Sequence, residues 1–270
     1  MKAIFVADLH SDTKQLDQLA QLIQEKDVEL LIIGGDLVEY ASSLAAQLPF
    51  IEQALVPFIQ TISIPVWVIP GNIEWTGTAK VYEQLAGRSL ISLLSLKPTD
   101  GHGLKFFGYP YCNPTPFTRK DFEKRDLQSD KHEPATATFL SDEEGKLIKK
   151  DQNYLNTVPS IEEDLAQLVE PGIWIMHAPP YGTSLDVIKS GDHVGSKAIR
   201  KRIEHIQPML TLHGHIHESP YMTHQWIDRI GTTISINPGR GAQLHAVLLH
   251  FEEEKLRSAE HTIFGKVSFD

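Results

Sequence analysis

Residues 3–10 read Ala-Ile-Phe-Val-Ala-Asp-Leu-His, a short apolar run that ends in an aspartate and a histidine. Compact apolar runs of this kind are typical of buried β-strands. Two further runs follow at 30–33 and 66–69, and each again leads into polar residues. Amphipathic, helix-type stretches separate the three runs, at 13–24 and 43–60. This alternation predicts β-α-β units, and therefore a parallel sheet covered by helices.

The same alternation returns after a break in the middle of the chain. A strand at 105–108 precedes a proline-rich, charged stretch, 109–159, which we interpret as a surface insertion with little sheet and one helix at 117–126. Segments of this length are often lids or binding loops, and a solvent-exposed loop without such a role fits the pattern equally well. No linker divides the chain, so we predict one α/β domain over 1–270. After the insertion we expect helices at 161–169 and 196–206, strands at 173–176 and 209–212, and antiparallel strands at 232–236, 244–250 and 262–268.

Composition excludes several classes of protein. The 270 residues include 35 acidic and 25 basic side chains, for a formal net charge of −10, which argues against duplex nucleic acid as a partner. With 41% hydrophobic residues the chain can bury a core, so disordered and fibrous classes are excluded. No apolar run reaches the roughly 18 residues of a membrane span, and residues 1–8 turn acidic too early for a signal peptide. The single cysteine, Cys112, excludes a disulfide framework, so we expect a cytoplasmic protein without a membrane partner.

Polar side chains of one chemical type follow five of the predicted strands. Ligands of open α/β sheets gather where the strands end, so we expect these side chains at one edge. A lone Asp-x-His, Gly-Asp or Gly-Asn is usually a helix cap or a turn, but five such sites after five apolar strands indicate a metal site. His213 lies inside a strand and is expected in the core or behind the ligands. The candidate ligands are Asp8, His10, Asp36, Asn72, His177, His215 and His217.

These candidates offer oxygen and nitrogen donors and no thiolate. Such a set suits Mn, Fe, Zn or Co, and we favour Mn. Two carboxylates, one amide and four imidazoles are more than one tetrahedral ion can use. The predicted cofactor is therefore two divalent metal ions with one bridging carboxylate, an arrangement that activates water and clamps a phosphate.

In order and spacing, these residues resemble the motifs of the calcineurin-like metallophosphoesterases. That family is marked by D-x-H, G-D-x-x-D, G-N-H-D/E, a lone His and G-H-x-H. The present chain has Asp8-Leu9-His10, Gly35-Asp36-Leu37-Val38-Glu39, Gly71-Asn72-Ile73-Glu74, His177 and Gly214-His215-Ile216-His217. The resemblance implies a four-layer αββα sandwich of two mixed sheets flanked by helices.

The resemblance also implies roles for the ligands. Asp8, His10, Asp36 and His217 would hold one metal, and Asp36, Asn72, His177 and His215 the other, with Asp36 as the bridge. Asp36, Asn72 and His215 are accordingly the predicted catalytic residues. The implied activity is hydrolysis of phosphodiesters or activated phosphate esters by a hydroxide held between the metals, on a small phosphate ester such as a nucleotide.

Two positions depart from the family pattern. Glu39 replaces the second Asp of G-D-x-x-D, which is a mild change. Ile73 replaces a histidine that contacts the scissile phosphate, and a hydrocarbon side chain can donate no proton. Ile73 itself is one candidate for contacting the substrate, and His193 and Tyr181 are the candidates for doing so in place of the histidine. The alternatives are an ordinary loop histidine before a helix capped by Ser196 and a tyrosine that only packs.

The missing histidine leaves a second class of function open. A chain with weakened catalysis would be a metal- or nucleotide-binding protein that acts as a sensor or scaffold. Hydrolysis of an aryl phosphodiester before and after chelation separates the two. A nuclease is disfavoured by the net charge of −10 and by the lack of a basic aromatic groove. The sequence is compatible with a homo-oligomer and does not specify one.

Overall fold

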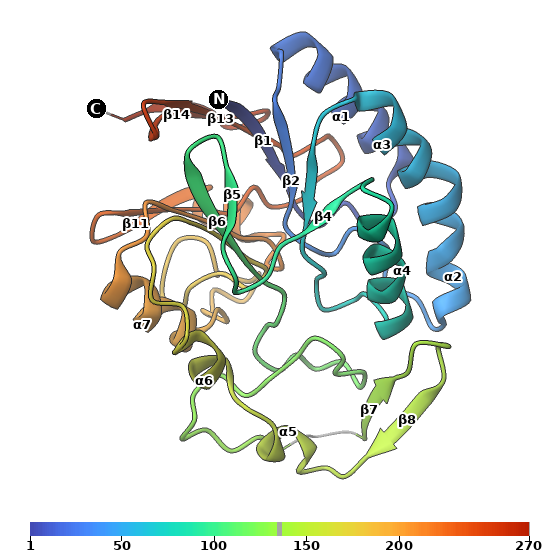
Figure 1. Cartoon of the computed structure of the whole chain (residues 1–270). Helices are drawn as coiled ribbons and strands as arrows, with labels where there is room; N and C mark the ends of the chain where they lie inside the picture. Colours follow the sequence, from blue (N-terminus) through green and yellow to red (C-terminus); the bar gives the residue numbers. More distant parts are fainter. Residues whose placement is uncertain (134–136, 270) are drawn as a thin grey trace.

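The computed structural model describes residues 1–133 and 137–269, and the run quoted first forms the centre of its larger sheet (Figure 1). This strand, β1 (Lys2–Val6), begins a parallel series through β2 (Leu30–Ile33), β3 (Val66–Val68) and β4 (Ser92–Leu93). On its other side β1 pairs antiparallel with β13 (Val247–Glu252). The sheet ends with β14 (Lys255–His261) and β15 (Gly265–Ser268).

The second sheet has six strands and is also mixed. Its parallel part contains β6 (Leu104–Tyr109), β9 (Ile173–Met176), β10 (Leu210–Leu212) and β12 (Thr233–Ile236). Antiparallel strands close both edges, β5 (Thr99–Gly101) beside β6 and β11 (Ile227–Ile230) beside β12. The expected strand at 232–236 is present as β12. It pairs antiparallel with β11, as predicted, but parallel with β10 on its other side.

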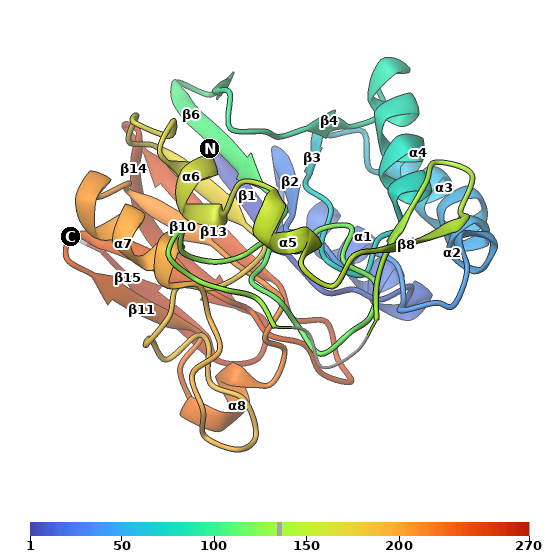
Figure 2. The same cartoon turned by 90° about the horizontal axis from the view of Figure 1, so that it is seen from below.

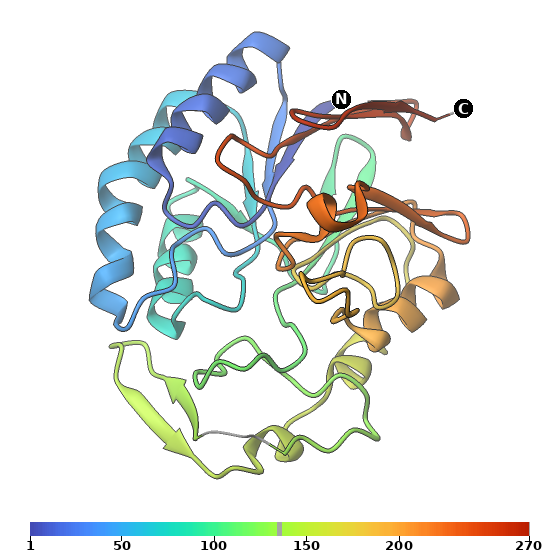
Figure 3. The same cartoon turned by 180° about the vertical axis from the view of Figure 1, so that it is seen from behind.

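Helices cover the outer face of each sheet (Figures 1 and 3). α1 (Thr13–Lys26) begins at Asp12, whose carboxylate accepts hydrogen bonds from the backbone N–H groups of Lys14 and Gln15, as expected of an N-cap. Behind the first sheet also lie α2 (Leu44–Phe50), the π-helical turn η1 (Ile51–Leu55), α3 (Val56–Ile62) and α4 (Thr76–Gly87). The second sheet is covered by α6 (Ile161–Leu165) and α7 (Lys197–Ile206). No helix within the described ranges is long and apolar enough to cross a membrane.

Three separate apolar cores define the layers. Ile4 and Val6 of β1 face the helices of the first sheet, whereas Ala3 and Phe5 face the second sheet, because successive side chains of a strand point to opposite faces. In the second sheet Trp174 packs with the α6 and α7 side chains. The chain therefore folds as two large mixed sheets packed together and flanked by helices, which confirms the predicted four-layer sandwich.

The predicted helix at 117–126 is wrong. That segment is irregular, because four of its charged residues, Arg119, Lys120, Glu123 and Asp126, are buried and bind other groups of the chain instead of solvent. Lys120 donates to the Thr115 carbonyl and to Glu123 Oε2, both at 2.6 Å. The Lys124 N–H donates to the carbonyl of Cys112 at 3.0 Å.

The rest of the insertion forms its own small elements. β7 (Thr138–Ser141) and β8 (Leu147–Lys150) make an antiparallel hairpin, and α5 (Tyr154–Thr157) follows. The hairpin lies beside the first turn of α4, where the Thr76 N–H donates to Ser141 Oγ at 3.0 Å (Figure 2). A short helix, α8 (Ser219–Thr223), lies outside the insertion, after the G-H-x-H segment.

Candidate metal centre

The candidate ligands meet at the carboxyl ends of parallel strands from both sheets. β1, β2 and β3 lead into Asp8, Asp36 and Asn72, and β9 and β10 lead into the three histidines 177, 215 and 217. Backbone hydrogen bonds tie the ends together within each sheet, from the Asp8 N–H to the Gly35 carbonyl and from the Gly214 N–H to the His177 carbonyl. The site therefore lies where the two sheets join.

Two groups of side chains present ligand atoms within 4.8 Å of one another. The first contains Asp8, His10, Asp36 and His217, and the second contains Asp36, His177 and His215. His10 Nε2 and His217 Nε2 are 2.9 Å apart, and His177 Nε2 is 3.3 Å from Asp36 Oδ1. Asp36 belongs to both groups, which is the position that a bridging carboxylate requires.

Asn72 completes the second group. Its Oδ1 lies 3.1 Å from His177 Nε2. Its Nδ2 is buried and has no hydrogen-bond partner within the described part of the chain. A buried amide donor without a partner is costly, so this atom faces a place where a ligand would bind.

The backbone is strained at four of the seven candidates. Asp8, His10, Asp36 and His215 have φ values of 57°, 48°, 50° and 67°, in the left-handed region. A non-glycine residue there costs of order 1–3 kcal/mol and persists only where the surrounding structure enforces it. The fold thus loses some stability in order to fix the direction in which these side chains point.

Two glycines make room for the carboxylates. A Cβ at Gly71 would lie 2.1 Å from Asp36 Oδ1, and one at Gly214 would lie 2.6 Å from Asp8 Oδ2. No side chain larger than hydrogen fits at either position. The glycines of the G-N and G-H motifs are therefore required by packing against the ligands.

Hydrogen bonds fix how the histidine rings face. His177 Nδ1 lies 2.9 Å from the Gly34 carbonyl, which can only accept, so Nδ1 carries a proton and Nε2 points at Asp36. A second partner of this kind is what orients metal-binding histidines. His213 differs, since its ring contacts the carbonyls of Met176 and Ala178 and the Thr211 hydroxyl. His213 is buried in the core and contributes no ligand atom.

Burial and neighbouring charges shift the pKa values of the site residues. Burial raises the pKa of Asp36, but the charge and hydrogen bond of His177 outweigh burial and hold that pKa well below its usual range. Burial lowers the pKa of His177, and Asp36 reverses this and raises it to about 9. Burial lowers the pKa of His215 to about 3, so that ring is neutral and free to coordinate. Protons on His177 thus supply positive charge that a divalent cation would replace, and metal affinity should fall as pH is lowered.

Glu74 joins the turns that carry Asp36 and Asn72. Its buried carboxyl group accepts the N–H groups of Leu37 at 2.9 Å and Gly71 at 3.0 Å. Between them, the Ile73 N–H donates to Asp36 Oδ1 at 3.1 Å. The Ile73 side chain, 3% exposed, lines a cavity together with His10, Asn72 and His215.

Sequence reasoning missed Arg119, which holds the same loop from the insertion. Its guanidinium donates to the carbonyls of Ile73 and Glu74, each at 2.6 Å, and pairs with Asp121 at 2.7 Å. It also lies over the Trp75 ring, 4.9 Å from the centroid. No local pattern marks this arginine, because its partners on that loop are backbone atoms 45 and 46 residues away.

Asn237 supports the site from a turn that it forms with Pro238 and Gly239. Within the turn, the Gly239 N–H donates to Asn237 Oδ1 at 2.9 Å. The Asn237 amide also donates to the carbonyls of Gly214 and Ile216, at 3.3 and 3.2 Å. This asparagine therefore holds the loop that carries His215.

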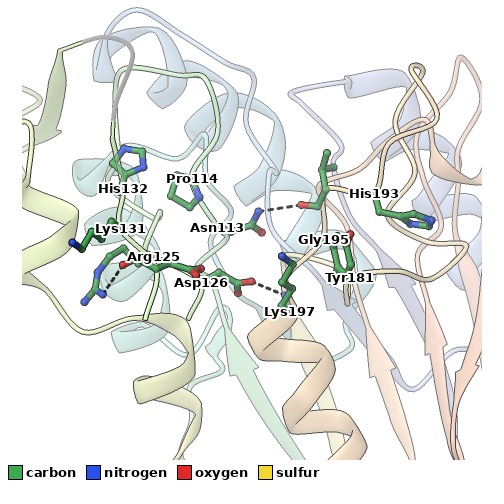
Figure 4. A pocket seen from close by; sticks show the side chains of 12 residues that line it. Asn113, Pro114, Arg125, Asp126, Lys131, His132, Tyr181, His193, Gly195 and Lys197 are labelled. Atoms are coloured by element: carbon green, nitrogen blue, oxygen red, sulfur yellow. Dashed lines mark hydrogen bonds between the residues drawn. The ribbon is translucent and has the colours of Figure 1, made fainter. Parts of the chain in front are cut away.

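His193 and Tyr181 line a neighbouring cavity of about 520 Å³, shown in Figure 4. His193 Nδ1 lies 2.7 Å from Asp186 Oδ1, and its ring points away from Asn113 (Figure 4). Tyr181 lies under the Lys197 ammonium, 5.1 Å from the ring centroid. Of the three predicted substrate-contacting residues, Ile73 lines the cavity of the metal centre, and the other two do not. Ser196 is the N-cap of α7, the role that it has in the alternative interpretation of His193 as an ordinary loop histidine.

We expect Arg119→Ala to lower the free energy of unfolding by about 3–5 kcal/mol, because it leaves a buried carboxylate, Asp121, without its cation. Metal affinity should fall too, since the Asn72 loop loses its support. Urea unfolding and equilibrium dialysis with Mn²⁺ measure the two effects. Arg257→Ala, a partly exposed arginine with distant ion pairs, is the control and should change stability by less than about 0.5 kcal/mol. An unchanged free energy of unfolding in Arg119→Ala would contradict this account.

Comparison with known proteins assigns the chain to one family. Residues 1–219 match the model of the calcineurin-like phosphoesterases. The chain belongs to the calcineurin-like phosphoesterase family. No curated protein sequence matches it.

Solved structures share the fold at low sequence identity. The protein TT1561 of Thermus thermophilus is 15% identical, with a TM-score of 0.56 over 96% of this chain and 98% of its own. A dimetal phosphatase from Danio rerio is 11% identical, with a TM-score of 0.54 over 98% of this chain and 96% of its own.

Proposed function

We propose that this chain is a phosphoesterase that depends on two divalent metal ions and hydrolyses phosphodiesters or activated phosphate esters. One observation carries the proposal: Asp36 belongs to both groups of candidate ligands. The family match and the fold shared with a dimetal phosphatase support it. We propose small phosphate esters as substrates, Mn²⁺ as the preferred metal and the cytoplasm as the compartment.

Asp8, His10, Asp36 and His217 would hold one ion, and Asp36, Asn72, His177 and His215 the other. Bound there, divalent ions supply an activated water and neutralise charge on the phosphoryl group. Asp36 contributes negative charge to both positions, and neutral His215 contributes a ring nitrogen. The unpartnered Nδ2 of Asn72 would donate to a phosphoryl oxygen.

The test is hydrolysis of bis(p-nitrophenyl) phosphate by the purified chain. We expect activity with Mn²⁺, its loss on chelation and its return when Mn²⁺ is added back. His177→Ala and His217→Ala should each abolish activity and leave the circular dichroism spectrum unchanged. His250→Ala is the control, because His250 is a half-exposed histidine outside the site. Activity that survives chelation, or that is retained in either ligand variant, would contradict the proposal.

Ile73 favours a second candidate function, a metal- or nucleotide-binding sensor with little catalysis. A general acid is worth about 10²–10⁴-fold in rate, and Ile73 cannot supply one. Two bound ions per chain without turnover of aryl or alkyl esters would support the sensor over the hydrolase.

A further inference from the structure

A cavity of about 590 Å³ opens onto the candidate metal centre. This volume lies in the range of small-molecule sites, about 300–1,000 Å³. Its lining includes the candidate ligands His10, Asp36 and His217 together with a set of apolar side chains. The apolar lining residues include Tyr40, Pro114, Pro116, Phe117, Ile188 and Ile216.

Tyr40 and Phe117 form an aromatic pair at this cavity. Their ring centroids are 5.0 Å apart and the ring planes are inclined by 32°. The two residues are 56% and 41% exposed, although large aromatic side chains are normally covered. Ring area that remains open beside a candidate catalytic centre is available to a ligand.

Both rings are attached to the loops that carry the metal centre. Tyr40 follows Glu39, whose N–H donates to Ser11 Oγ at 2.9 Å and whose carbonyl accepts from Gln47 Nε2 at 2.9 Å. Phe117 lies two residues before Arg119, which is anchored on the Ile73 and Glu74 carbonyls. The aromatic pair is therefore held at a fixed place relative to the loops of the metal centre.

The charges of the cavity limit what can lie there. Among its described lining residues there is no lysine or arginine, and Glu218 adds a negative charge. The cationic side chains Lys131 and Lys197 line the neighbouring cavity. Asn113 and Val194 line both cavities, and Asn113 Nδ2 donates to the Val194 carbonyl at 3.0 Å (Figure 4). An anionic group beside the aromatic pair would thus find no cationic side chain among these lining residues.

We propose that the substrate is a phosphodiester whose non-leaving alcohol carries a planar aromatic ring system, such as a nucleobase, which stacks against Phe117 and Tyr40. This inference rests on the proposed function, because the phosphate is placed at the metal centre. A pair of aromatic rings is stabilised by more than the burial of their surface area alone accounts for, so an aromatic side chain favours a planar aromatic partner. Stacking of one base on a protein ring changes affinity by about 5- to 150-fold.

Three diesters with the same p-nitrophenolate leaving group test the proposal: the thymidine 5′, ethyl and octyl p-nitrophenyl phosphates. We expect kcat/KM with Mn²⁺ to be at least about tenfold higher for the thymidine ester than for the ethyl ester. Phe117→Ala and Phe117→Leu should each lower this ratio about tenfold. Ile263→Ala, an equally exposed apolar residue elsewhere, should leave the ratio unchanged.

Two results would overturn the inference. One is a thymidine-to-ethyl ratio that Phe117→Ala does not change. The other is an octyl ester preferred over the thymidine ester, since this would identify an alkyl site.

Binding separates the inference from the proposed function. Thymidine 5′-phosphate should bind the Mn²⁺-loaded chain at least about tenfold more tightly than ethyl phosphate, and Phe117→Ala should remove the difference. If this binding preference is observed but no ester is hydrolysed, only the proposed function is contradicted. If thymidine 5′-phosphate and ethyl phosphate bind equally well, the inference is contradicted.

Discussion

Replacing Asp36 by asparagine is expected to lower kcat/KM for bis(p-nitrophenyl) phosphate by at least about 10²–10³-fold, the usual loss when one electrostatic group of an active site is removed. Asp36 is the side chain shared by both groups of candidate ligands. The amide keeps the shape of the carboxylate and can still accept the hydrogen bond from the Ile73 N–H. The variant therefore loses the bridging charge with little disturbance of the loop.

Metal stoichiometry decides the interpretation. Elemental analysis after dialysis against Mn²⁺ should find two ions per chain in the wild type and fewer than two in Asp36→Asn. Asp186→Asn is the matched control, because Asp186 is also a fully buried carboxylate but belongs to neither ligand group. Two ions retained at wild-type affinity in Asp36→Asn would exclude this residue as the bridge.

The second large effect is expected from Ile73→His. The Ile73 backbone is already fixed, since its carbonyl accepts from Gln47 at 2.8 Å and from Arg119 at 2.6 Å. Its side chain lines the cavity beside Asn72 and His215. A histidine there could protonate an alkyl leaving group, a step worth up to about 10²–10⁴-fold, whereas an aryl leaving group needs no proton. The gain should be smaller if the ring lacks a supporting partner.

The measurement is the ratio of kcat/KM for alkyl and aryl phosphodiesters in wild type and Ile73→His. We expect this ratio to rise in the variant, and Ile73→Leu, which keeps an apolar side chain of equal size, to leave it unchanged. If the ratio in Ile73→His stays at the wild-type value with both metals bound, the leaving group requires no donor at this position.

Strands and ligand motifs could be predicted because both are local in sequence. The run at 3–7 is apolar at every position, and β1 is buried on both faces as such a run requires. Asp8 and Asp36 follow parallel neighbours in one sheet, so the order of the strands alone brings them together. Their roles as metal ligands stay predictions that the variants above can test.

Other features could not be predicted because their causes are remote in sequence. α4 has the sequence Thr-Gly-Thr-Ala-Lys-Val-Tyr-Glu-Gln-Leu-Ala-Gly, with two glycines and no side-chain cap, so its own propensity is weak. Packing of Tyr82 and Leu85 into the first core compensates. The charges around Arg119 likewise resemble those of a solvent-exposed segment, and only the fold shows that they are buried.

The two ends of the candidate metal centre are far apart along the chain. His10 and His217, whose ring nitrogens nearly touch, are separated by 207 residues. During synthesis on the ribosome, the amino-terminal donors therefore emerge long before their partners, and closing so long a loop is slow. One edge of β1 also stays unpaired until β13, near the carboxyl end, has been synthesised. A nascent chain thus cannot assemble the complete set of candidate ligands, and full metal loading, if the proposed site is correct, would be a sign that translation has passed the G-H-x-H segment.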